Sequence, residues 1–163
     1  MLQRLAFALL ASATTIPSQI GLGEAGFQLV VNNTSYGTLC PRVHPCTYAP
    51  GSLARGTSAE FVVRGVQFQP WAVALWIDQP HQCLSIPGFQ NQLMSAAVIL
   101  ALSGAMTEQD TIRACPGGIG RARVLVPASL PLGSALTLQA LAWSYLSANQ
   151  VPTFTTAIRA VVQ

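Results

Sequence analysis

The feature that most constrains this fold is a series of short apolar runs whose large side chains fall on every second residue. In residues 27–32 these are Phe27, Leu29 and Val31, and residues 120–126 alternate in the same way. A period of two is typical of β-strands that have one face in a core. No segment keeps a period of about 3.6 residues over three turns, so the sequence predicts an all-β protein.

Proline and glycine separate these runs and limit their length. Pairs such as Pro50-Gly51 and Pro87-Gly88 are turn signals. Many short strands between such turns indicate an antiparallel β-sandwich of about seven to eight strands. The expected strands cover residues 27–32, 58–64, 71–77, 82–86, 95–102, 120–126, 134–143 and 153–162.

The alternation also assigns side chains to the core or to solvent. In the second of these strands it points Phe61 and Val63 inward and Glu60 and Arg64 outward. Residues 71–77 are apolar on both faces, so they are expected to form a central, covered strand. In the strand 120–126, the residues expected to face inward are Ala122, Val124 and Val126.

Two further segments are expected to be turns. Residues 32–35, Asn-Asn-Thr-Ser, contain two overlapping glycosylation sequons, and we interpret them as a polar turn. Residues 117–120, Gly-Gly-Ile-Gly, lack the lysine of a phosphate-binding loop, so we interpret them as a hairpin turn.

The N-terminus has the composition of an export leader. Arg4 precedes an apolar run over residues 5–11, and the small residues 11–13 have the spacing that a signal peptidase prefers. Later polar residues make the segment too polar for a stable membrane span of about 20 apolar residues. We expect residues 1–25 to be a signal peptide or hydrophobic leader, with a retained amphipathic segment as the alternative, and residues 26–163 to be a single β-sandwich domain.

The four cysteines support export, because an even number in an exported chain favours disulfides. They are Cys40, Cys46, Cys83 and Cys115, and they allow three pairings. We favour Cys40–Cys46, since the short proline-containing loop between them closes easily, together with Cys83–Cys115. These disulfides fit a secreted protein, extracellular or at the cell surface.

Metal binding and nucleic-acid binding find little support. A zinc site would need His44 and His81 beside thiolates, but the cysteine spacing matches no common zinc motif. The net charge of +3 is dispersed, and only Arg121 and Arg123 lie close together. We therefore expect no metal, no other cofactor and no nucleic-acid partner.

The sequence offers no convincing catalytic set. There are five acidic residues, and Glu108 and Asp110 are expected to lie together in a solvated turn. Asp78 and His81 form the one acid–histidine pair, but no GxSxG nucleophile elbow accompanies it. We expect a protein that is not an enzyme.

Aromatic residues suggest the main alternative, a carbohydrate- or ligand-binding module. Trp71, Trp76 and Trp143 could stack on sugar rings if they were exposed. They lie among Val, Leu and Ala in expected strands, so we expect them in the core.

Three segments together resemble a known class of domains. They are YGTLCP at residues 36–41, GRARVLVP at 120–127 and GSALTLQA at 133–140. They are similar to motifs of small secreted β-domains in exported planctomycete and myxobacterial proteins, although Leu39 replaces a glycine and residues 153–156 replace an asparagine–serine element. The resemblance implies an extracellular β-sandwich and no known activity.

Composition then favours a function in assembly. Only 8% of the residues are charged and none is lysine, which leaves surface that another subunit could cover. We expect a non-enzymatic cell-surface or extracellular structural or adhesive module that associates with itself, as in a filament or sheath, or with other cell-surface proteins. The strand at residues 27–32 is the expected edge for this contact.

Overall fold

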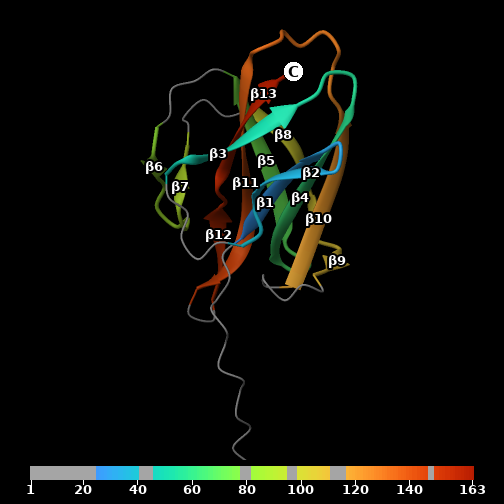
Figure 1. Cartoon of the computed structure of the whole chain (residues 1–163). Coiled ribbons are helices and arrows are strands. Elements are labelled where there is room, and N and C mark those ends of the chain that lie inside the picture. The colour runs from blue at the N-terminus through green and yellow to red at the C-terminus, as the bar shows by residue number, and fades with distance from the viewer. Residues whose placement is uncertain (1–24, 41–45, 78–81, 95–98, 111–116, 147–148) are drawn as a thin grey trace, which may run out of the picture.

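The structure is a computed structural model that describes residues 25–40, 46–77, 82–94, 99–110, 117–146 and 149–163 (Figure 1). The expected leader lies almost wholly outside these residues. The described part contains strands and no helix, so none of its elements is a helix that could span a membrane. Two sheets pack face to face, which confirms the all-β sandwich.

The first sheet, sheet A, is antiparallel throughout. In order across the sheet its strands are β2 (Thr34–Thr38), β1 (Gly26–Val31), β4 (Ser58–Val66), β10 (Gly117–Leu125) and β9 (Glu108–Gln109). The short strand β9 pairs with β10 only at Gly118 and Ile119. The remainder of β10 therefore has one ladder partner, β4, among the described residues.

The second sheet, sheet B, is mixed, because β3 and β13 run parallel. In order its strands are β3 (Tyr48–Leu53), β13 (Ala157–Val162), β11 (Ala135–Leu146), β5 (Pro70–Ile77) and β8 (Ile99–Ala105). Strand β12 (Asn149–Phe154) also pairs with β11, and β6 (Leu84–Ser85) pairs with β7 (Gln92–Leu93) beside the sandwich. Strand β5 is an interior strand, as its apolar sequence predicts.

The core consists of the inward faces of both sheets. From Ile158 onward β13 alternates, with Ile158, Ala160 and Val162 buried and Arg159 exposed. The large side chains of β1 are buried in the same way, on the parity that the sequence predicts. Trp71 of β5 joins this core, which it enters between Gly104 of β8 and Gly120 of β10.

Buried polar side chains attach the β6–β7 segment to sheet B. The Gln139 amide donates to the carbonyl oxygens of Gln92 and Thr155, at 2.9 and 2.8 Å. Its oxygen accepts from the backbone N–H of Met94 at 3.0 Å. Gln139 belongs to one of the sequence motifs noted above, and these bonds give it a structural role.

Several expected turns are instead strands. Pro50 and Gly51 lie within β3, where an edge position tolerates a proline. Residues 117–120 begin β10, because a glycine there permits close packing: a Cβ on Gly120 would lie 2.0 Å from Nε1 of Trp71. Of the turn expected at residues 32–35, Asn32 and Asn33 form the two-residue connection between β1 and β2, whereas Thr34 and Ser35 begin β2.

One placement prediction was wrong, and two residues have an exposure that their predicted orientation did not indicate. Strand β1 is not an edge, because β2 covers one side of it and β4 the other. Arg64 lies on the outer face of sheet A, as predicted, but it is buried there against Asp110. Val124 faces the space between the sheets, as predicted, but it is 36% exposed. Val124 is exposed because β10 has no second neighbour at its level among the described residues.

Candidate functional site

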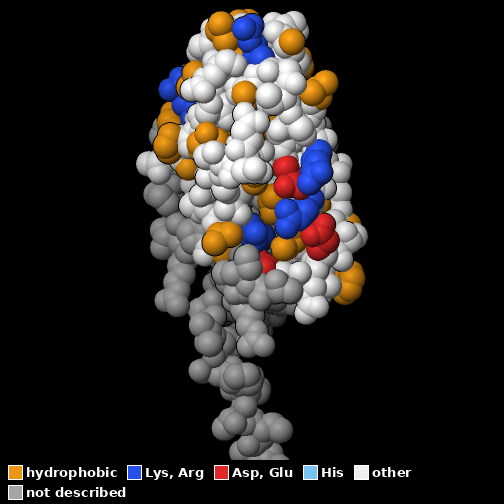
Figure 2. All heavy atoms as spheres, turned by 45° about the vertical axis from the view of Figure 1, so that its right-hand side comes forward, with side chains coloured by type: hydrophobic (Ala, Val, Ile, Leu, Met, Phe, Trp, Pro, Cys, Tyr) orange, Lys and Arg blue, Asp and Glu red, His pale blue; other side chains and the backbone are white. Residues whose placement is uncertain are grey.

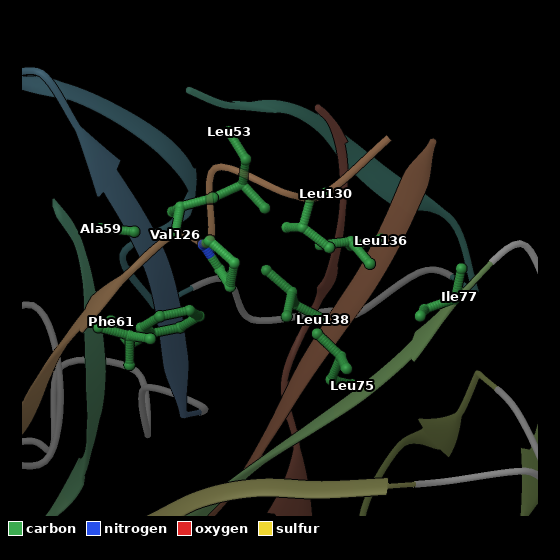
Figure 3. A pocket seen from close by; sticks show the side chains of 11 residues that line it. Leu53, Ala59, Phe61, Leu75, Ile77, Val126, Leu130, Leu136 and Leu138 are labelled. Carbon is green, nitrogen blue, oxygen red and sulfur yellow. The ribbon is translucent and has the colours of Figure 1, made fainter. Parts of the chain in front are cut away.

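The clearest concave feature of the described residues is an apolar pocket between the two sheets (Figure 3). It has a volume of about 230 Å³, and no polar side chain lines it. Side chains from both sheets point into it, together with the loop that follows β10. The lining residues are Leu53, Ala59, Phe61, Leu75, Ile77, Val124, Val126, Pro127, Leu130, Leu136 and Leu138.

Among the described residues, no strand closes this side of the sandwich. On sheet B, β8 begins at Ile99, opposite Leu75, and leaves the end of β5 uncovered among the described residues. On sheet A, β9 pairs only near the start of β10. Further along the same intersheet space, Trp71 reaches from β5 to Gly120 of β10 and fills it. At the pocket, none of the described lining side chains is as large as Trp71, and the small residue Ala59 faces the space.

Exposed apolar side chains mark the mouth of this pocket. Ile77 and Ile99 are 49% and 60% exposed on the side of sheet B. Val124 lies across from them on β10. Apolar patches at the surface of a protein commonly mark a site of interaction, so this side of the sandwich is a candidate ligand or contact site.

The sheet edges form a second candidate surface. Of the four strands that end the two sheets, β2, β3 and β8 contain no charged residue, whereas the short strand β9 contains Glu108. Monomeric β-proteins usually protect such edges with lysine or other charges. Proline and glycine interrupt β3, whereas β8 carries apolar residues over much of its length.

Charged residues gather on the outer face of sheet A, where the sequence predicted only a solvated turn (Figure 2). Arg64 and Asp110 form an ion pair, with Nε and Oδ2 3.2 Å apart and both side chains buried. The Arg64 guanidinium also donates to the side-chain oxygen of Gln28. Burial lowers the pKa of Arg64 below its ordinary value, and the charge of Asp110 opposes this shift.

Around this pair lies a set of exposed ion pairs. Arg121 contacts Glu108 at 2.9 Å and Glu60 at 3.7 Å, and Arg123 contacts Glu60 at 3.3 Å. The charges balance one another, and exposed pairs of this kind contribute little to stability. The Arg121–Glu108 pair attaches β9 to β10. We assign a structural role to this cluster.

The tryptophans do not form an exposed platform. Trp71 and Trp76 are 4% and 2% exposed, which confirms that they are core residues. Trp143 is half-buried on β11. The interpretation as a glycan-binding module based on exposed tryptophans is therefore wrong for Trp71 and Trp76.

The disulfide pairing that we favoured from the sequence is also wrong. Cys46 is bonded to Cys83, with their Cα atoms 6.0 Å apart, and Cys40 takes part in a disulfide as well. Cys115 lies outside the described residues. The Cys46–Cys83 bond links the residues before β3 to those before β6, a connection of 37 positions that spacing alone did not suggest.

The other sequence candidates are not brought together in the described structure. Asp78, His81 and His44 lie outside the described residues. Within them, no three His, Cys, Asp or Glu side chains are grouped as metal ligands. No protein-family model matches the chain, and no curated protein matches it.

Proposed function

We propose that the protein is a non-enzymatic, exported β-sandwich module that acts outside the cell by associating with copies of itself. The observation that carries this proposal is the absence of charge from three of the four outermost strands, β2, β3 and β8. A strand from a neighbouring molecule could pair with such an edge through backbone hydrogen bonds.

Strand β8 is the edge best suited to this contact. Its described exposed side chains are Ile99, Ser103 and Ala105, so it offers apolar and small uncharged groups. The only proline among these three edges is Pro50 of β3, which removes one backbone donor there.

Two features support action outside the cell. The Cys46–Cys83 disulfide is compatible with an oxidising, extracellular location. The N-terminal segment has the composition of a signal peptide. Other cell-surface proteins with open sheet edges would be partners of the same kind.

The test is the assembly state of the exported, non-reduced protein. We expect light scattering to give a mass that rises with protein concentration, and negative-stain electron microscopy to show regular polymers. The variant Ser103→Lys places a charge on the β8 edge and should reduce assembly. Ser129→Lys, in the exposed loop after β10, is the matched control and should assemble as the wild type does. A wild-type protein that stays monomeric at high concentration contradicts the proposal.

A further inference from the structure

The pocket between the sheets has a lining that suits hydrocarbon. All eleven residues that line it are apolar, and its volume is about 230 Å³. Water in a cavity needs polar partners, whereas apolar cavities of about 150 Å³ in proteins stay dry and bind small apolar molecules. The pocket is therefore better matched to an apolar ligand than to water.

The pocket is accessible from outside the molecule. Ile77 and Val124 line it and are partly exposed, and Ile99 extends the apolar surface beyond it. A ligand can thus place one end between the sheets and continue along the surface. Small-molecule sites are commonly concave and apolar, with a few polar groups that orient the ligand.

Such a polar group lies beside the pocket wall. Nη1 of Arg55 is 3.4 Å from the carbonyl oxygens of Ala128 and Leu130, and Leu130 lines the pocket. The Arg55 backbone N–H donates to the main-chain oxygen of Gln163 at 3.1 Å. Among the described side chains, the ion pairs are made by Arg64, Arg121 and Arg123 and not by Arg55. An exposed guanidinium of this kind is complementary to a carboxylate.

We propose that this pocket binds a single-chain amphiphile, with the alkyl chain between the sheets and an anionic carboxylate headgroup at Arg55. The proposal goes beyond self-association through the sheet edges, because it uses the space between the sheets rather than the β8 backbone. It requires no chemical step, since the ligand binds and leaves unchanged.

The first experiment is a calorimetric titration of the non-reduced protein with decanoate below its critical micelle concentration. We expect saturable one-to-one binding. Val124→Trp places a bulky ring at the mouth and should abolish the binding heat. Val161→Trp is the matched control, because Val161 is a similarly exposed valine on β13, away from the pocket, and it should bind as the wild type does.

The second experiment tests the headgroup. Arg55→Gln should weaken decanoate binding about tenfold, the effect of losing one charge-assisted hydrogen bond, and should leave the binding of 1-decanol unchanged. Absence of saturable binding, or equal binding by Val124→Trp, would overturn the proposal. A different outcome would also overturn it. If the wild type is a dimer that does not bind decanoate, and light scattering shows that Val124→Trp dissociates this dimer, then a second copy of the chain occupies the pocket.

Discussion

At the scale of single residues, the buried ion pair on sheet A leads to a direct prediction. Asp110→Ala leaves the buried Arg64 guanidinium without its counter-ion and should lower the free energy of unfolding by about 3 kcal/mol. Glu108→Ala removes an exposed partner of Arg121 and should cost less than about 1 kcal/mol. Urea unfolding at neutral pH measures both. Equal small losses would mean that Arg64 reaches water once Asp110 is gone.

The same pair shows what a strand pattern can and cannot predict at this scale. Alternation correctly placed Phe61 and Val63 of β4 in the core. It also placed Arg64 correctly on the outer face, but it could not predict that Arg64 is buried there, because the rule considers one strand and its two faces. Arg64 is covered from outside its own strand, by Asp110 just beyond β9. A contact between segments so far apart in sequence leaves no periodic signal.

At the scale of elements, the β1–β2 hairpin carries the next prediction. Asn32 and Asn33 have φ values of 48° and 62°, a left-handed pair that matches the twist of a two-residue hairpin turn. Asn33→Val forces a β-branched residue into this conformation and should cost about 1–2 kcal/mol of stability. Asn33→Gly is the control, and it should not lower stability, because glycine adopts this conformation without strain. Thermal unfolding of the two variants distinguishes these outcomes, and equal melting temperatures would contradict the assignment of the turn.

Long alternating strands were predictable, and short or irregular ones were not. The strands β1, β4 and β5 follow from their apolar spacing, and the structure confirms them. The strand expected at 153–162 is divided between the end of β12 and β13. Two-residue strands such as β9 have too few residues for any period. Residues 117–120 suggested a turn because the reason for a glycine at position 120, the nearby Trp71 ring, belongs to another strand.

At the scale of the whole molecule, the candidate sites depend on which strands are neighbours and where each stops. Among the described residues, the pocket lies where β10 has no ladder partner besides β4 and where no strand pairs with the end of β5 on its β8 side. The uncharged edges could be identified only once the strand order was known, since β1 had been expected at an edge and β2 occupies it. Composition did indicate a surface with few charges. At the sheet edges, this lack of charge leaves strands open to pairing with another molecule.

The Cys46–Cys83 bond belongs to this scale, because it joins segments on either side of β3, β4 and β5. In the loop-entropy model, closing a loop of 37 positions stabilises a protein by about 4 kcal/mol. The double variant Cys46→Ala/Cys83→Ala should lose stability of this order, as measured by urea unfolding of the non-reduced protein. The double variant keeps the disulfide in which Cys40 takes part, so the loss of stability reports on the Cys46–Cys83 bond alone. Peptide mapping should find a Cys46–Cys83 cross-link in the wild type, and finding Cys46 linked to Cys40 would instead restore the pairing expected from sequence spacing.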